Sequence, residues 1–243
     1  MAFSLDGYDH ILLDMNGTFV LDFDNFDAEQ DYGATYQKSG YGSQRPDEAD
    51  ALVRSAYAYL AVRYVDDAYA DAFPSVANAL DTISEKPLTT QQRTELVDTF
   101  AQHEMGWHPE PHRRALAILA QLKPLSVLSN LWAPRFRWDK AFAFWGIDRH
   151  FQHVHFSSDG PCMKPSPRFF KQALDAMRPS TTAGRVLYVG DSYRCDVLGA
   201  QASGMDSVWL NRKDAPIPSR LVAQAVYRDL VSFVNDCAPS TSV

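Results

Sequence analysis

The sequence predicts an α/β protein with a parallel, Rossmann-like sheet that is wound on both sides and interrupted by an all-helical insertion. Two observations predict this fold class. From residue 111 onward, short apolar runs alternate with patterns of helical period, which is typical of a parallel sheet covered by helices. From residue 20 to residue 110, in contrast, only helical patterns are found. The length of 243 residues leaves room for one such core and a smaller inserted domain.

Five short apolar runs predict the strands of the sheet. Each run is followed directly by polar residues and is almost continuously apolar, which is typical of a strand buried on both faces. Since helical segments separate the later runs, we expect the strands to lie parallel. The predicted strands span residues 10–13, 125–128, 153–156, 186–189 and 207–210.

Helical patterns fill the intervals between the later strands. A helix is expected to begin at Pro111, because proline suits a first helical turn and an apolar stripe follows it. Two further helices are expected at residues 136–146 and 167–177. Residues 194–202 also have helical character, and Gly204 is the expected C-terminal cap.

The segment between the first and second strands is predicted to be a helical domain of its own. Apolar residues recur at helical spacing in residues 52–63 and 76–83, and Thr89 with Gln92 resembles a capping box that begins another helix. At roughly 90 residues, the segment is too long for a loop and has about the size of a small domain. The predicted division is a core of residues 1–19 and 111–243 with an insertion of residues 20–110.

Composition and charge exclude several classes of protein. The chain has 23 Lys and Arg against 30 Asp and Glu, and this net charge of -7 without a basic run argues against nucleic-acid binding. Its apolar stretches fall far short of the roughly 20 residues that span a bilayer, so no membrane association is expected. The three cysteines have no metal-ligand spacing, and the N-terminal residues lack the pattern of a secretory signal, so we expect a cytoplasmic protein.

The polar residues that follow the predicted strands are the candidates for a functional site. In an open parallel sheet, ligands bind at the carboxyl ends of the strands. There the sequence places carboxylates, a lysine, and hydroxyl and amide groups, which favour a cation together with an anionic substrate. Mg²⁺ prefers oxygen ligands from carboxylates, water and substrate phosphate. The candidates are Asp14, Asn16, Thr18, Ser129, Asn130, Lys164, Asp191 and Asp196.

Four motifs among these residues resemble those of the haloacid dehalogenase superfamily. Residues 14–19 (Asp-Met-Asn-Gly-Thr-Phe) resemble its first motif, DxDGT, and residues 129–130 (Ser-Asn) resemble the second. Residues 163–167 (Met-Lys-Pro-Ser-Pro) resemble the third, and residues 190–196 resemble the fourth, GDxxxxD. The order and spacing match over nearly the whole chain. The resemblance implies that the insertion is a helical cap that closes over the site. About 35 residues separate the second motif from the third, which is too few for a second, larger cap.

The resemblance also implies a role for each candidate. Asp14 would be the nucleophile, and Mg²⁺ would be held by the carboxylates of Asp14 and Asp191 and by the backbone carbonyl of Asn16. Asp196 would support the metal site or orient Lys164, which would neutralise charge on the phosphoryl group. The implied activity is Mg²⁺-dependent hydrolysis of a small phosphorylated metabolite through an aspartyl-phosphate. The sequence itself leaves open whether the protein is a monomer or a homodimer. The groups expected to contact the substrate are Gly17, Thr18, Ser129 and the amide of Asn130.

Asn16 departs from the pattern of the family's phosphatases. They have a second aspartate here, which protonates the leaving oxygen and then activates water, and an amide can do neither. General acid–base catalysis is worth about 10²–10⁴ in rate, so the loss matters most for a poor leaving group.

Three interpretations of Asn16 stay open at this point. The enzyme acts on phosphates with good leaving groups, such as acyl phosphates, or recruits an acid from the cap, for which His103, Glu104 and His108 are candidates. Alternatively, it attacks carbon, as the family's dehalogenases do without the second aspartate. The third interpretation is a protein that binds phosphate and Mg²⁺ without turnover. Dehalogenases need no Mg²⁺ and usually alter the fourth motif, whereas this chain keeps Asp191 and Asp196, which favours the phosphatase.

Other conspicuous side chains are expected to be structural. The tyrosines of the insertion are predicted to pack, and its arginines are predicted to be exposed rather than to bind substrate. Phe19 and Trp132 follow the first and second motifs and are expected either in the pocket wall or in the core. Cys195 has no paired base and is expected to be structural. The tyrosines and arginines concerned are Tyr57, Tyr59, Tyr64, Tyr69, Arg45 and Arg63.

Overall fold

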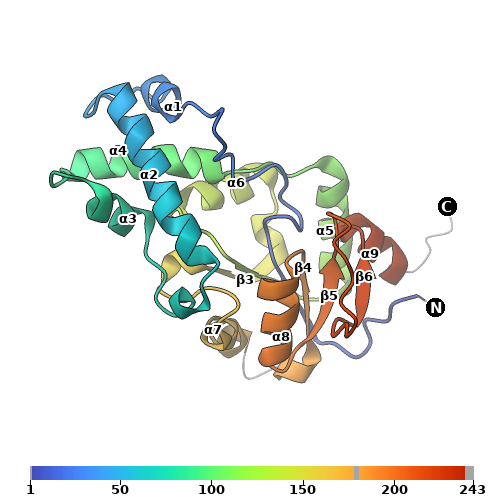
Figure 1. The fold of residues 1–243 in the computed structure, drawn as a ribbon. Coiled ribbons are helices and arrows are strands. Elements are labelled where there is room, and N and C mark those ends of the chain that lie inside the picture. The colour runs from blue at the N-terminus through green and yellow to red at the C-terminus, as the bar shows by residue number, and fades with distance from the viewer. Residues whose placement is uncertain (1, 178–180, 239–243) are drawn as a thin grey trace.

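The computed structural model describes residues 2–177 and 181–238. In these residues, the core is a parallel six-stranded sheet with the strand order β3-β2-β1-β4-β5-β6 (Figure 1). The predicted fold class is therefore confirmed, and all five predicted strands are present with ends that differ by two residues at most. The strands are β1 (His10–Leu13), β2 (Leu125–Ser129), β3 (Phe151–Phe156), β4 (Val186–Gly190), β5 (Asp206–Leu210) and β6 (Ala225–Tyr227).

Helices cover both faces of the sheet, as predicted. Successive residues of β1 face opposite sides, because Ile11 and Leu13 belong to one buried cluster and Leu12 belongs to another. The first cluster joins the sheet to α5, α6 and α9, and the second joins it to α7 and α8. This two-sided burial explains why the strands are almost continuously apolar. These helices are α5 (Glu110–Leu122), α6 (Phe136–Trp145), α7 (Pro167–Met177), α8 (Gly199–Ala202) and α9 (Leu230–Cys237).

Local sequence signals place the ends of several core helices. Pro111 lies in the first turn of α5, and Gly146 ends α6 in the left-handed conformation with a φ of 67°. The helix predicted at residues 194–202 is divided into a π-helix, Tyr193–Leu198, and the short α8. π-helical turns are frequent at functional sites, and this one contains Asp196, the last residue of the fourth motif.

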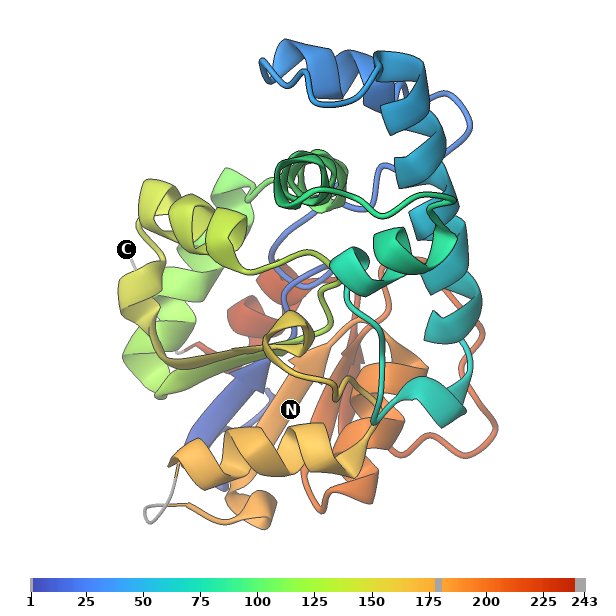
Figure 2. The ribbon, with the colours of Figure 1, turned by 90° about the vertical axis from the view of Figure 1, so that its left-hand side faces the viewer.

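The insertion is a helical unit that lies beside the sheet (Figure 2). Its buried residues form a cluster distinct from those on the sheet, which Ala133 of the core joins. The capping box of Thr89 and Gln92 is present at the start of α4, as predicted. Residues 20–110 are all described and contain no strand beyond two isolated bridges at their ends. The exact division of the chain between core and insertion stays a prediction. The helices of the insertion are α1 (Tyr32–Lys38), α2 (Pro46–Tyr64), α3 (Val76–Ile83) and α4 (Thr90–Glu104), with a 3-10 turn at Asp67–Tyr69.

Polar contacts tie the insertion to the core. Arg137 of α6 donates from Nε to Asp98 Oδ1 of α4 at 2.6 Å. Two backbone hydrogen bonds connect the segment after α2 to the segment before α7: Phe73 N to Pro161 O at 2.9 Å and Met163 N to Ala70 O at 2.8 Å. The insertion is therefore held over one edge of the sheet (Figure 2).

Strand β6 and helix α9 were not predicted from the sequence, and the helix expected before the loop at residues 40–46 was predicted without bounds. Strand β6 has only three residues, all half-buried at the sheet edge, so it shows no periodicity. Helix α1 has seven residues, about two turns, which is too short for a clear apolar stripe. Helix α9 begins with a capping box of Asp229 and Ser232, a signal that the sequence does contain.

The helices give no sign of a membrane span. Among the residues that the structure describes, no helix is both long enough and apolar enough to cross a bilayer. The 19-residue α2 carries charged side chains along its length, among them Asp50, Arg54 and Arg63.

Candidate active site

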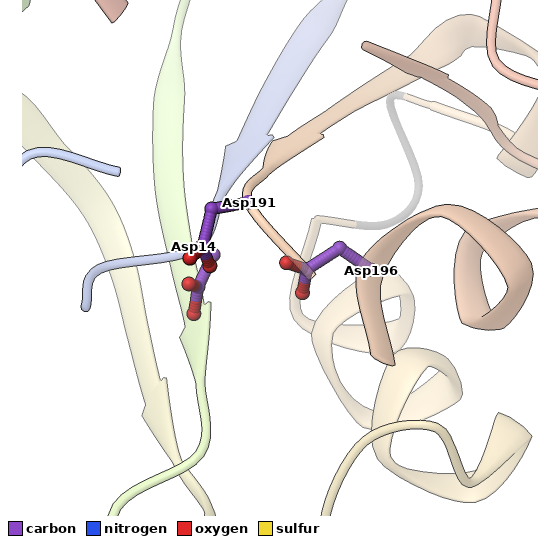
Figure 3. A group of neighbouring side chains, drawn as sticks. All are labelled: Asp14, Asp191 and Asp196. Atoms are coloured by element: carbon purple, nitrogen blue, oxygen red, sulfur yellow. The ribbon is translucent and has the colours of Figure 1, made fainter. Parts of the chain in front are cut away.

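The carboxyl ends of three adjacent strands bring predicted site residues together. Asp14 follows β1, Ser129 ends β2 and Asp191 follows β4, and β1 pairs with both β2 and β4. Ser129 Oγ donates a hydrogen bond to Asp14 Oδ1 at 2.7 Å. Carboxylate oxygens of Asp14, Asp191 and Asp196 lie within 4.8 Å of one another (Figure 3). Parallel pairing of β1 with β4 thus brings Asp14 next to Asp191 and Asp196 of the distant fourth motif.

Lys164 is the buried cation of this cluster. Its Nζ donates to Asp14 Oδ1 at 2.7 Å, to Asp196 Oδ1 at 2.6 Å and to the Tyr188 hydroxyl at 2.9 Å. An ammonium group has three donors, so all of them are satisfied. Although burial opposes it, the charges of Asp14 and Asp196 raise the pKa of Lys164 well above its usual value, which keeps the lysine charged.

Asp196 uses its oxygens to position its neighbours. Oδ1 accepts from Lys164 and from the Tyr188 hydroxyl at 3.1 Å, and Oδ2 accepts from the backbone N–H of Ser192 at 2.8 Å. A Cβ on Gly190 would lie 2.4 Å from Asp196 Cγ, so only glycine permits this approach. Of the two roles implied for Asp196, this arrangement favours the orientation of Lys164.

Asn130 holds the loop that carries Lys164. Its Nδ2 donates to Lys164 O at 3.0 Å, and its Oδ1 accepts from Lys164 N at 2.8 Å. The side chain therefore acts as a clamp on the lysine backbone, a contact that the sequence motif alone does not reveal.

The donor set around Asp14 fits a divalent cation with oxygen ligands. Burial, followed by the charges of Asp14 and Asp196, raises the pKa of Asp191 to about 8. Burial also raises the pKa of Asp14 to about 6, against the opposing charge of Lys164. Asn16 Oδ1 is a buried oxygen without a hydrogen-bond partner in the described chain. One lysine does not balance three crowded carboxylates, and a cation such as Mg²⁺ would remove the excess negative charge.

Gly17 allows the first-motif loop to approach the acidic cluster. Its φ is +84°, and a Cβ there would lie 2.3 Å from Asp191 Oδ2. Thr18 is fully buried, and its hydroxyl has no partner among the described groups. Thr18 does not line the cavity, whereas Asn16 does.

A cavity of about 390 Å³ lies between this cluster and the insertion. The sheet side contributes the acidic residues, Lys164 and Ser129, and the other walls are largely aromatic. Tyr57 and Tyr64 of α2 face Trp132 of the core, with ring centroids 5.6 and 5.5 Å apart from it. Three further charged residues line the cavity, namely Asp24, Glu104 and Lys213.

The three acids considered for the cap lie in different places. His103 points into the insertion, where its ring nitrogens lie 3.3 Å from Asn25 O and 2.9 Å from Thr35 Oγ1. His108 is buried with Nδ1 2.7 Å from Phe19 O, and neither histidine lines the cavity. Glu104 does line it.

The carboxylate of Glu104, however, is used in hydrogen bonds to the backbone. Its two carboxylate oxygens accept from the backbone N–H groups of Trp132 at 2.6 Å and Ala133 at 3.0 Å. Burial, helped by the charge of Asp24, raises its pKa to about 8 although these hydrogen bonds favour the ionised form. The side chain therefore anchors the end of α4 to the loop after β2.

The ambiguous residues of the sequence divide between the cavity and other surroundings. Trp132 lines the cavity, and Phe19 is fully buried in the core. The expectation that all four tyrosines only pack is incomplete, because Tyr57 and Tyr64 line the cavity; a helical period does not reveal what the helix faces. The arginines lie elsewhere, as expected: Arg45 pairs with Asp47 at the surface, and Arg63 stacks on Tyr59. Cys195 is buried and lines the cavity.

Several residues of the site were not identified from the sequence. Tyr188 lies inside β4, where its hydroxyl bridges Lys164, Asp196 and Leu128 O, and its place in an apolar run made it indistinguishable from a core residue. Asp24 and Lys213 lie in loops outside the four motifs. The only signal for these two was their place in connections near the carboxyl edge of the sheet.

Comparison with known proteins identifies the family of these motifs. The family model described as haloacid dehalogenase-like hydrolase matches residues 8–204, which include all the predicted site residues. The match therefore spans the first strand, the insertion and the fourth motif.

Individual relatives match over shorter stretches. A mouse (Mus musculus) protein named haloacid dehalogenase-like hydrolase domain-containing protein 3 is 44% identical over 64 residues, which are 26% of this chain and 24% of the relative. The phosphoserine phosphatase of Thermus thermophilus is 27% identical over 134 residues, 54% of this chain and 52% of the relative. The matched part thus spans about a quarter to a half of these curated relatives.

Solved structures share the fold over most of their length. The 2-haloacid dehalogenase of Pseudomonas syringae superposes with a TM-score of 0.62 at 20% identity, covering 92% of this chain and 95% of that one. At this identity the likeness shows the common architecture, and the reaction has to be argued from the site itself.

Proposed function

Because the chain belongs to the haloacid dehalogenase-like hydrolases, we propose that it is a Mg²⁺-dependent phosphatase acting on a small phosphorylated metabolite. The observation that carries this proposal is the state of Asp14. Its Oδ1 accepts from both Ser129 and Lys164, while Oδ2 has no hydrogen-bond partner in the described part of the chain. One oxygen is fixed and the other is available for attack on phosphorus, which forms an aspartyl-phosphate.

The metal would be held by Asp14, Asp191 and Asn16. When bound, Mg²⁺ supplies charge stabilisation and alignment for the phosphoryl oxygens. The three crowded carboxylates, which one lysine does not balance, support this assignment.

The other residues of the chain act by position and charge. Lys164 is fixed by Asp196, Tyr188 and the Asn130 clamp, so its ammonium can neutralise charge as the phosphoryl group transfers. Ser129 holds the carboxylate of Asp14 in one orientation. The insertion covers the cavity and would exclude water and select the leaving group.

A carbon-centred reaction of the dehalogenase type is the second candidate, and Asn16 is the observation that favours it. Displacement of a halide needs no proton donor, so an amide in place of the second aspartate costs nothing there. Such a reaction also needs no metal. It therefore does not explain why the carboxylate of Asp191 lies so close to that of Asp14. The acidic cluster therefore favours phosphorus over carbon. The third candidate is a protein that binds phosphate and Mg²⁺ without turnover.

Turnover of an aryl phosphate and an acyl phosphate, each with Mg²⁺ and with EDTA, tests the proposal. The variants are Asp14→Asn and, as a matched control, Asp148→Asn, which changes an exposed carboxylate before β3. We expect Mg²⁺-dependent turnover that Asp14→Asn lowers by at least about 10³-fold and Asp148→Asn leaves unchanged. Turnover of a haloacid that persists in EDTA would replace the phosphatase by the carbon-centred reaction.

A further inference from the structure

Tyr64 brings a hydroxyl group from the insertion to the catalytic cluster. It is the last residue of α2, and its hydroxyl lies 3.4 Å from Asn130 Nδ2, which donates to it. Asn130 is the residue that clamps the backbone of Lys164. Tyr64 lines the same cavity as Asp14 and Asn16, and its hydroxyl lies beside Asn130, which also lines that cavity.

The proton of this hydroxyl is uncommitted. A phenol offers one donor and accepts through its oxygen, and the contact with Asn130 uses the oxygen. Its other polar neighbour in the described residues is Cys195 Sγ at 4.0 Å, and sulfur is a weak acceptor. The hydroxyl is therefore free to donate to a ligand.

Contacts from both parts of the protein fix the position of Tyr64. The Arg194 side chain donates from Nη2 to Tyr64 O at 2.9 Å and also pairs with Asp67 of the insertion. The ring packs against Trp132 at 5.5 Å and Phe73 at 6.2 Å between centroids. A side chain held in this way loses little entropy when it binds a transition state.

We propose that Tyr64 is the proton donor to the leaving oxygen, in the role that Asn16 cannot perform. This inference rests on the proposed phosphatase activity and deepens it, because it makes phosphate esters of ordinary alcohols substrates in spite of Asn16. Other groups fit less well. Glu104 commits both oxygens to backbone N–H groups, and Asp24 is an exposed residue whose side chain makes no hydrogen bond to the catalytic cluster within the described part of the chain.

The proposed reaction has two steps, after which Asp14 and Tyr64 return to their starting states. Asp14 Oδ2 forms a bond to phosphorus, the bond from phosphorus to the leaving oxygen breaks, and that oxygen takes the proton of Tyr64 and departs as an alcohol. Water then attacks the phosphorus of the aspartyl-phosphate and gives its proton to the Tyr64 phenolate. This step releases phosphate and restores the Asp14 carboxylate and the phenol.

The surroundings of Tyr64 keep its phenol protonated. Burial, with the thiol of Cys195 as a second cause, raises the pKa of Tyr64 well above its usual value, so the phenol stays protonated at neutral pH. An alkoxide is a stronger base than a phenolate, so proton transfer to it remains favourable.

The test compares leaving groups in Tyr64→Phe, which keeps the ring and removes the hydroxyl. We expect kcat for an alkyl phosphate to fall by about 10²-fold and kcat for an aryl phosphate, whose leaving group needs no proton, to fall by less than about 3-fold, with KM nearly unchanged. The matched control is Tyr59→Phe, on the same helix but outside the cavity, which should change neither rate. If Tyr64→Phe lowered kcat equally on the alkyl and the aryl phosphate, the proposal would be overturned. It would also be overturned if Asp24→Asn lowered kcat on the alkyl phosphate as much as Tyr64→Phe does.

The same assay in an Asn16→Asp background separates this inference from the proposed function. If an aspartate at position 16 supplies the proton, removing the Tyr64 hydroxyl should then cost less than about 5-fold on the alkyl phosphate. Equal losses in both backgrounds would overturn the role of Tyr64. An inactive wild type with an active Asn16→Asp variant would also overturn it and would leave the phosphatase framework intact. Inactivity of both proteins would overturn the proposed function as well.

Discussion

The carboxyl edge of the sheet and the insertion line one cavity, but they hold their side chains in different ways. On the sheet side, Asp14, Lys164 and Asp196 are at most 5% exposed and are joined by hydrogen bonds of 2.6 to 2.7 Å. On the insertion side, the Tyr64 hydroxyl accepts one hydrogen bond at 3.4 Å, its backbone carbonyl accepts another from Arg194 at 2.9 Å, and its ring is held by packing. The side chains of the acidic cluster are therefore fixed by strand geometry and buried charge, whereas the side chains that the insertion contributes to the cavity are placed by tertiary packing.

The largest effect is expected from breaking the buried network at Lys164. Lys164→Met leaves the carboxylates of Asp14 and Asp196 buried without their cation, which should cost about 3–5 kcal/mol of stability and more than about 10²-fold in kcat. The pKa of Asp14 should rise further, because the charge of Lys164 lowers it in the wild type. Thermal unfolding and turnover measure both effects.

Lys171→Met is the matched control, because it removes an exposed lysine paired with Asp175. We expect this variant to lose less than about 1 kcal/mol of stability and to keep its turnover unchanged. Similar losses in both variants would mean that the sheet side is no more tightly organised than the surface.

Gly17 and Gly40 form a matched pair for substitution, because both have a positive φ and only Gly17 lies at the acidic cluster. In Gly17→Ala, the new Cβ would lie 2.3 Å from Asp191 Oδ2 at a φ of +84°, which should displace Asp191, weaken Mg²⁺ binding and lower turnover by at least about 10-fold. Gly40, at a φ of +78°, has open space around the same position. Gly40→Ala should therefore cost only about 1 kcal/mol of backbone strain.

A titration of the unfolding temperature with Mg²⁺ distinguishes the two glycine variants. We expect stabilisation by Mg²⁺ in the wild type and in Gly40→Ala, and a much weaker response in Gly17→Ala. An equal response in all three would exclude Asp191 as a metal ligand next to Gly17.

The smallest effect is expected at the contact between the two regions. Arg194→Met removes the hydrogen bond to Tyr64 O and the exposed pair with Asp67, which should change stability by less than about 1 kcal/mol and lower kcat on an alkyl phosphate by about 2–5-fold. Arg45→Met, which breaks an ion pair within the insertion, should leave kcat unchanged. Identical rates in the two variants would show that the position of Tyr64 does not depend on Arg194.

The same contrast explains what the sequence could predict. Apolar runs ending in polar residues located five strands and, through them, Asp14, Ser129 and Asp191, because a strand end fixes a side chain locally. Tyr188 and Tyr64 were not recognised as site residues, since a tyrosine in a buried strand or at helical spacing is interpreted as a packing residue. Their roles depend on hydrogen bonds to Lys164 and Asn130, which are 24 and 66 positions away in the chain.

The choice among proton donors shows the same limit. His103, Glu104 and His108 were candidates by residue type and by their place in the insertion. The structure turns both histidines away from the cavity and commits Glu104 to the backbone of Trp132 and Ala133. Residue type alone cannot show which polar groups are already satisfied, and that is what separates Glu104 from Tyr64.

The most direct test of the central claim is to trap the covalent intermediate. Acid-quenched enzyme, mixed with Mg²⁺ and an aryl phosphate, would be digested and the peptide containing Asp14 analysed by mass spectrometry, for the wild type and for Asp14→Asn. The account predicts a phosphoryl group on Asp14 in the wild type and none in the variant. Full turnover without a phosphorylated Asp14, or turnover that survives Asp14→Asn, would contradict it.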